Sequence, residues 1–133
     1  MRSDKTSCEP GDKRKHTGGV GEETAANYLI SRGYSIIERN FVCKGGEIDI
    51  IASTRDKVLV FVEVKARRDL SYGPPQLAVN SFKQRQISKA ALTWLSKKKM
   101  HEHNARFDVI AILISDDGRH MLEHIVNAFE LAY

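Results

Sequence analysis

Two carboxylates and one ammonium group interrupt apolar runs that are otherwise typical of buried strands. Glu63 and Lys65 follow the apolar run 58–62, and Asp49 lies inside the apolar stretch 48–51. A charged side chain in a buried strand costs several kcal/mol to desolvate unless an opposite charge or a metal ion compensates it. These three residues are therefore the first candidates for chemistry.

The spacing of these residues predicts that the two acids meet. Side chains alternate along a strand, so Glu63 and Lys65 share one face, and Asp49 shares a face with Glu47 and Ile51. A hairpin that joins the two runs places Asp49 beside Glu63, where the two carboxylates repel each other. A divalent cation is the simplest partner that relieves this repulsion, and oxygen ligands favour Mg²⁺ or Mn²⁺ over zinc.

A third carboxylate lies on the helix that the apolar spacing predicts over residues 20–32. At about 100° per residue, Glu22 projects within roughly 20° of Leu29, in the middle of the apolar stripe. Glu23 points toward solvent. Glu22 is therefore the acid of this helix that we expect to face the sheet.

Each of these residues also has a purely structural interpretation. Glu63 and Lys65 can form a simple ion pair, Asp49 can cap a turn, and Glu22 can be a charge at a helix end. The structural interpretation requires a separate coincidence on each of three elements, so we favour a common site.

The elements that must position these residues follow the order αβββαββ. The helix at 20–32, which Gly33 ends, precedes strands at 34–42, 47–53 and 57–66, a helix from Pro74 and Pro75 to about Lys98, and strands at 107–114 and 121–126. Short connections make the first three strands antiparallel, and the second helix is a crossover that makes the third and fourth strands parallel. These features predict a three-layer α/β fold with a mixed sheet flanked by helices.

The length of 133 residues suits one domain with a single core. Residues 1–17 contain almost nothing apolar, so we expect a mobile tail there and the domain at 18–133. The longest apolar run is too short to cross a membrane, and the N-terminus lacks the apolar core of a signal peptide. We therefore expect no association with membranes. Because Cys8 and Cys43 make no disulfide framework, we also expect a cytoplasmic protein.

Several short segments form a specific combination. They are Gly21-Glu22 at the start of a helix, Gly-Glu-Ile-Asp-Ile-Ile-Ala at 46–52, Val-Phe-Val-Glu-Val-Lys-Ala-Arg at 60–67, Arg-Phe-Asp-Val-Ile at 106–110 and Asn-Ala-Phe at 127–129. Together they resemble the YraN-like family of small bacterial proteins, predicted endonucleases that are similar to archaeal Holliday junction resolvases. Asp49 with Glu63-Val64-Lys65 is similar to the PD-(D/E)XK signature of the restriction-endonuclease-like superfamily. The resemblance covers residues 18–129, with Ala66 where the family usually has Thr, and implies a restriction-endonuclease-like αβββαβ core.

The resemblance also implies a function, namely metal-dependent cleavage of phosphodiester bonds in nucleic acid, with DNA, including branched DNA, as the expected substrate. In this interpretation Asp49 and Glu63 hold Mg²⁺ or Mn²⁺ together with the backbone carbonyl of Val64. Lys65 positions the attacking water and stabilises the charge that develops on the phosphate, and Glu22 orients water or binds a second ion. The catalytic set would then be Glu22, Asp49, Glu63 and Lys65.

The net charge of +4 and the basic residues near these acids favour an anionic partner. The residues expected to contact a sugar-phosphate backbone are Arg67, Arg68, Lys83, Arg85 and Lys89, although an ordinary solvated face remains an alternative. Gln84 is either a residue behind the metal ligands or a hydrogen-bonded core residue. The alternative function is a nucleic-acid-binding protein of the same fold without turnover. The sequence leaves open whether the chain forms a homodimer.

The histidines predict no competing zinc site. His120 and His124 have a spacing that suits zinc on a helix, but on a strand they would lie about 13 Å apart.

Overall fold

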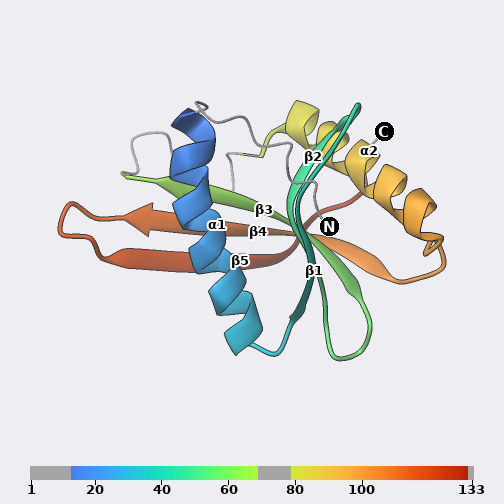
Figure 1. Ribbon diagram of the computed structural model, residues 1–133, viewed down its shortest axis with the longest axis horizontal. Helices are drawn as coiled ribbons and strands as arrows, with labels where there is room; N and C mark the ends of the chain where they lie inside the picture. Colours follow the sequence, from blue (N-terminus) through green and yellow to red (C-terminus); the bar gives the residue numbers. More distant parts are fainter. Residues whose placement is uncertain (1–12, 69–78, 132–133) are drawn as a thin grey trace.

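The computed structural model describes residues 13–68 and 79–131, which form a five-stranded sheet and two helices (Figure 1). In chain order the elements are α1 (Lys13–Ser31), β1 (Ser35–Cys43), β2 (Gly46–Ser53), β3 (Leu59–Arg67), α2 (Ser81–Lys98), β4 (Ala105–Ile114) and β5 (His120–Phe129). The strands lie side by side in this same order, with β3 and β4 parallel and the other neighbours antiparallel. The predicted α/β class, mixed sheet and αβββαβ core are confirmed.

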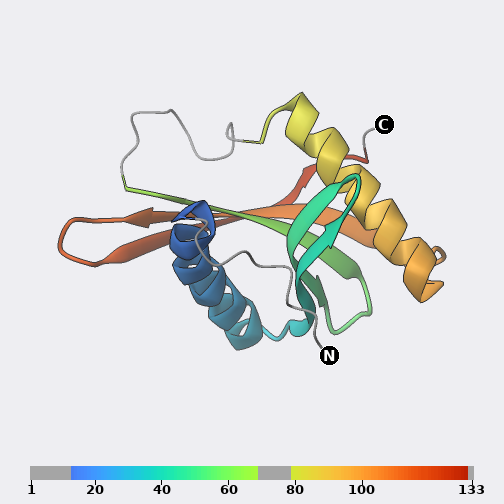
Figure 2. The ribbon, with the colours of Figure 1, turned by 45° about the horizontal axis from the view of Figure 1, so that its top comes forward.

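The two helices lie on opposite faces of the sheet (Figures 1 and 2). The path from β3 through α2 to β4 is the crossover that makes these two strands parallel, as predicted. Neither described helix is long and apolar enough to span a membrane.

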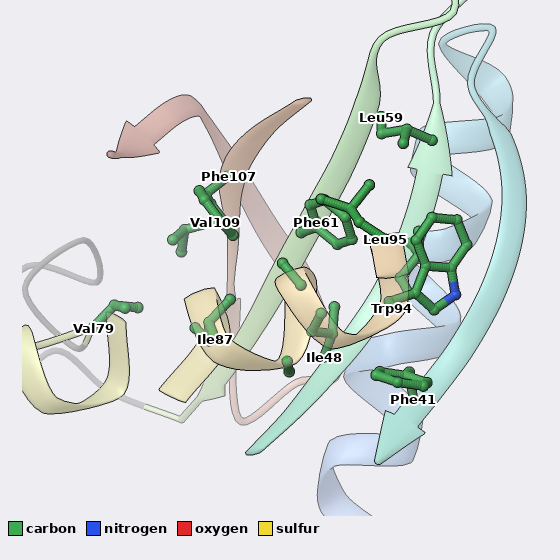
Figure 3. Packing of buried hydrophobic residues seen from close by; sticks show 13 residues of the cluster. Phe41, Ile48, Leu59, Phe61, Val79, Ile87, Trp94, Leu95, Phe107 and Val109 are labelled. Carbon is green, nitrogen blue, oxygen red and sulfur yellow. The ribbon is translucent and has the colours of Figure 1, made fainter. Parts of the chain in front are cut away.

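The core under α2 is rich in aromatic side chains (Figure 3). The rings of Phe61 and Trp94 meet edge to face with their centroids 5.9 Å apart, and Phe107 lies 5.7 Å from Phe61 on the other side. The indole Nε1 of Trp94 donates a hydrogen bond to Glu38 at 2.9 Å, so its one polar group is satisfied. This packing fixes α2 on the sheet.

The core under α1 is built from small and branched aliphatic residues, including Ala25, Ala26 and Leu29 of the helix. The helix lies very close to β3, because a Cβ added at Gly21 would be 3.0 Å from the Cβ of Ala66. A larger residue at this position would push the helix outward. Gly21 therefore allows the next residue, Glu22, to approach the sheet.

The ends of α1 were predicted with different success. Gly33 has a φ of 92° and Tyr34 N–H donates to the Leu29 carbonyl, so the predicted helix stop is confirmed. At the other end the helix begins at Lys13 instead of Val20, so residues 13–17 of the expected mobile tail are helical. Lys and Arg have high helix propensity, and adding a turn to an existing helix is easier than nucleating one. The rest of that expected tail lies outside the described residues.

The helix α2 begins later than predicted. Asn80 has an extended backbone, and its side chain accepts a hydrogen bond from Lys83 N–H, so it is the N-cap of a helix that starts at Ser81. The predicted start at Pro74 and Pro75 lies outside the described residues. The predicted basic end is confirmed, because Lys97 and Lys98 form the last turn.

The last strand is longer than predicted. β5 continues beyond Val126 to Phe129, across an irregularity at Asn127, which has a φ of 54°. Extra residues in a bulge let a strand resume pairing, and here β5 contains two of them, because Val109 pairs with Ile125 and Phe107 with Phe129.

Candidate metal centre

The strands β2 and β3 separate at Asp49. Ile50 and Val62 form the last residue pair of the hairpin on this side, and Asp49 Oδ2 accepts a hydrogen bond from Val64 N–H at 2.8 Å. The carboxylate thus takes the place that a strand carbonyl would have in a regular ladder. The register, continued by one residue, sets Asp49 opposite Glu63, which is the arrangement that the predicted hairpin requires.

The regular alternation of faces is interrupted at the same point. Ile48 and Ile51 both belong to the core under α2, although residues three apart on a regular strand face opposite sides. In the neighbouring strand, Asn40 lies between the partners of residues 48 and 50 and has a φ of 55°. The alternation that predicts one shared face for Glu47, Asp49 and Ile51 therefore does not hold here.

Glu63 is the most deeply buried acid of this site, with 5% of its side chain exposed. Two ammonium groups face one of its oxygens, because Oε2 lies 3.6 Å from Lys65 Nζ and 3.7 Å from Lys83 Nζ. Burial, and then the charge of Asp49, raises the pKa of Glu63 to about 8, although the two lysines act in the opposite direction. The protein therefore compensates the charge of Glu63 only in part.

Glu22 approaches the same site from α1. Burial, and then the charge of Asp49 together with a hydrogen bond to it, raises the pKa of Glu22 to about 7. Arg39 and Asn40 lower it by a smaller amount. The neighbouring Glu23 is exposed and pairs with Arg39 at 2.9 Å. The helix thus presents Glu22 to the sheet and Glu23 to the surface, as the helical geometry predicts.

Asp49 connects the other two acids. Burial also raises its pKa, as does the charge of Glu47, whereas the hydrogen bond from Val64 N–H lowers it. Interactions with Glu22 and with Glu63 make the three carboxylates a chain with Asp49 in the middle. Two nearby lysines do not fully compensate three ionised carboxylates. The site therefore favours protonation of these acids or binding of an added cation.

The donor set suits a small, hard cation. Among the described residues, no group of three or more Asp, Glu, His or Cys side chains is arranged so that it could hold a metal ion by itself. Magnesium commonly uses one or two carboxylates and keeps several waters. Asp49 and Glu63, with the nearby backbone of Val64, fit that requirement. We refer to Glu22, Asp49, Glu63, Lys65 and Lys83 as the acid cluster.

The structure brings one of the five predicted nucleic-acid-binding residues to the candidate metal centre. Lys83 belongs to the acid cluster, whereas Arg68, Arg85 and Lys89 are exposed and Arg67 is partly exposed. The role of all five in binding stays a prediction. The amide Nε2 of Gln84 donates to the Val79 carbonyl at 3.0 Å, which supports its interpretation as a satisfied polar residue.

A second polar cluster on β4 and β5 was not predicted from the sequence. Asp108 accepts hydrogen bonds from Arg106 at 3.0 Å and from His124 Nε2 at 2.7 Å. His124 Nδ1 in turn lies 3.1 Å from the Tyr28 hydroxyl, and Arg106 also donates to Tyr34. A signal was present, because Asp108 interrupts an apolar strand as Asp49 does. We refer to these five residues as the clamp.

Comparison with known proteins assigns the chain to a family. The sequence profile of the "Uncharacterised protein family UPF0102" matches residues 21–112. The chain belongs to the UPF0102 family. This confirms the resemblance to the YraN-like proteins, and the matched range contains the whole acid cluster.

Relatives in this family match nearly the full chain. A UPF0102 protein of Pelobacter propionicus is 68% identical over 120 residues, which cover 90% of this chain and 86% of the relative. A UPF0102 protein of Trichlorobacter lovleyi is 56% identical over 123 residues, which cover 92% and 97%. Among solved structures, a chain described as "Structure of EndoMS-dsDNA2 complex" matches 80% of this chain and 39% of that chain, with a TM-score of 0.37 and 15% identity. The TM-score and the sequence identity of this match are both low.

Proposed function

We propose that this UPF0102 protein is a metal-dependent endonuclease that hydrolyses phosphodiester bonds in nucleic acid, with DNA as its substrate and Mg²⁺ or Mn²⁺ as its cofactor. The observation that carries the proposal is the chain of carboxylates Glu22, Asp49 and Glu63 at the point where β2 and β3 separate. Carboxylates that the protein compensates only in part are suited to bind a divalent cation.

Each member of the acid cluster has a distinct role in this proposal. Asp49 and Glu63 would hold the metal with the Val64 carbonyl, and a bound metal would supply Lewis-acid chemistry and an activated water molecule. Lys65 is one-third exposed, so its ammonium group can reach a phosphate oxygen while staying near Glu63. Glu22 orients water from the side of α1. Positioning and charge stabilisation are the main needs of phosphodiester cleavage, since the substrate is itself anionic.

The exposed cations would hold the strand on either side of the cleaved bond. Arg68, Arg85 and Lys89 have no role in either core, and each contact with a phosphate would release counterions. Binding should therefore weaken as the salt concentration rises. An affinity that stays constant between low and high salt would contradict the nucleic-acid part of the proposal.

A cleavage assay with end-labelled single-stranded, duplex, flap and four-way-junction DNA tests the proposal. We expect cleavage of at least one substrate with Mg²⁺ or Mn²⁺ and none with EDTA. Isothermal titration calorimetry should show metal binding that Glu63→Gln removes. Salt-dependent DNA binding without metal binding or cleavage would instead identify a binding protein without turnover.

A further inference from the structure

A hollow lies between the β1–β2 turn and α2, directly beside the acid cluster. It measures about 270 Å³ and is widely open to solvent. This is slightly less than the roughly 300–1,000 Å³ of pockets that hold drug-sized molecules, so it has room for one base-sized group.

The hollow and the acid cluster share a wall. Lys83 lines the hollow, and its ammonium group lies 3.7 Å from the carboxylate of Glu63. Glu47 lines the hollow as well, and its charge acts on Asp49. A group in the hollow would therefore be adjacent to anything bound at the candidate metal centre.

The two walls of the hollow, the β1–β2 turn and α2, pack closely against each other. Figures 1 and 2 show the β1–β2 turn beside α2. A Cβ at Gly46, which has a φ of 157°, would lie 2.6 Å from the Gln86 carbonyl oxygen, and one at Gly45 would lie 3.2 Å from the Lys89 Cβ. Two glycines thus let the turn pack directly on the helix. The hollow is part of the folded structure and does not require a ligand to open it.

The lining combines groups that recognise a nucleobase. Gln86 lines the hollow, and within the described residues its side-chain amide makes no hydrogen bond, so it can both donate to and accept from the edge of a base. Val42 is 46% exposed and offers an apolar surface for the face of the base. Lys44 and Lys83 supply positive charge for the attached phosphates.

An exposed aromatic residue lies one helical turn away. Phe82 precedes Gln86 by four residues on α2, so the two side chains are neighbours on the helix surface, and 62% of Phe82 is exposed. An aromatic face beside positive charges is the usual platform on which unpaired bases stack.

We propose that this hollow is a subsite for one unpaired nucleotide next to the scissile phosphate, with its base on Gln86 and Val42 and its phosphates near Lys44 and Lys83. This inference rests on the proposed function and names its substrate class: nucleic acid that contains an unpaired nucleotide near the cleaved bond. A base that stays stacked in a duplex cannot enter a hollow of this kind, so fully paired DNA leaves the subsite empty.

The test compares two DNA duplexes of the same sequence, of which one carries a single extra, unpaired 2-aminopurine. Fluorescence anisotropy in EDTA measures binding without cleavage, and the fluorescence of 2-aminopurine reports whether that base leaves the stack. We expect the full-length protein to bind the duplex with the unpaired base about tenfold more tightly than the paired duplex, with a rise in 2-aminopurine fluorescence.

Two neighbouring residues provide the matched variants. Gln86→Ala should reduce the tenfold preference to about twofold or less and leave the affinity for the paired duplex unchanged. Arg85→Ala should weaken binding of both duplexes equally, because Arg85 is exposed and would contact the backbone. Unchanged melting temperatures would show that both variants are folded.

The outcomes separate this inference from the proposed function. Equal affinity for the two duplexes, or a preference that Gln86→Ala leaves intact, would overturn the subsite while cleavage of DNA still stood. A Gln86-dependent preference without cleavage of any substrate would support the subsite and contradict the nuclease. No binding of either duplex would overturn the subsite, and the nuclease would then be decided by the cleavage assay with the other DNA substrates.

Discussion

The clamp and the acid cluster shift the pKa of a buried carboxylate in opposite directions. Asp108 of the clamp is fully buried, and its two oxygens accept hydrogen bonds from Arg106, His124 and the Asn127 backbone N–H. Burial alone would raise the pKa of Asp108, but the hydrogen bonds from His124 and Arg106 outweigh it, and the pKa lies below its ordinary value. Glu63 is nearly as buried, and yet its pKa is raised to about 8.

The difference separates a structural acid from a candidate functional one. The clamp joins α1, β4 and β5 and leaves Asp108 fully satisfied by donors of the chain itself. Asp49 of the acid cluster accepts a backbone hydrogen bond from Val64 N–H, and the described residues supply no other backbone donor to it. The groups that interact with Asp49 also include two acids, Glu22 and Glu63. Burial of an acid is therefore weak evidence for function, and incomplete compensation by the protein is the stronger sign.

The largest effect should come from Asp49→Asn. Asparagine can still accept the hydrogen bond from Val64 N–H, so the fold should survive and the metal-free protein should be no less stable. Loss of a metal ligand should lower DNA cleavage by about 10³-fold and abolish the heat of Mg²⁺ or Mn²⁺ binding. If the variant binds metal as the wild type does, the metal site lies elsewhere.

The same substitution in the clamp should act on stability instead. Asp108→Asn places an amide against donors of Arg106 and His124, so at least one buried donor loses its partner. We expect a loss of about 3 kcal/mol in the free energy of unfolding, measured by urea denaturation, with metal binding by the folded fraction retained. A change below about 0.5 kcal/mol would show that the clamp does not stabilise the fold.

Glu22→Gln should have an intermediate effect. If Glu22 orients water at the metal, its loss should lower cleavage by about ten- to a hundredfold, whereas Glu23→Gln should remain near wild type. The metal-free melting temperature should rise in Glu22→Gln, because one of three mutually repelling acids is removed. A lower melting temperature, or equal effects of the two substitutions, would identify Glu22 as a structural residue.

A further effect is on the pH dependence of stability without metal. The folded pKa values of Glu63 and Glu22, about 8 and about 7, exceed their ordinary value of 4.5, so the folded state holds extra protons between these limits. Stability in EDTA should therefore fall as the pH rises from about 5 to 8. Asp108, with its lowered pKa, acts in the opposite direction and loses its contribution only in acid.

Thermal unfolding in EDTA between pH 4 and 9 measures this profile. The same scan with Mg²⁺ should show a larger stabilisation at pH 8 than at pH 5, because protons compete with the metal for the carboxylates. A metal-free melting temperature that increases steadily from pH 5 to 8 would contradict this expectation. It would mean that the protein compensates the carboxylate charges of the acid cluster as fully as that of Asp108 in the clamp.

The sequence predicted what depends on local pattern. The strand order, the parallel crossover and the meeting of Asp49 with Glu63 follow from apolar periodicity and short connections. Lys83 could not be assigned to the acid cluster, because its placement depends on how α2 crosses the sheet. The positive φ at Asn40 was also missed, since such a residue in a strand leaves no periodic signal. Asp108 could have been noticed, but only Arg106 is near it in the sequence, and the donors His124 and Asn127 lie 16 and 19 residues away.

The order in which the chain can fold follows from the connections around β3. The β2–β3 hairpin closes over residues 54–58, whereas pairing of β3 with β4 must wait for the chain from 68 to 104. Closing a short loop loses less entropy, so the hairpin should form first. Asp49 and Glu63 then become neighbours before the lysine of α2 can reach them. Protons or divalent ions present during synthesis should therefore influence how quickly this hairpin forms, well before any substrate is bound.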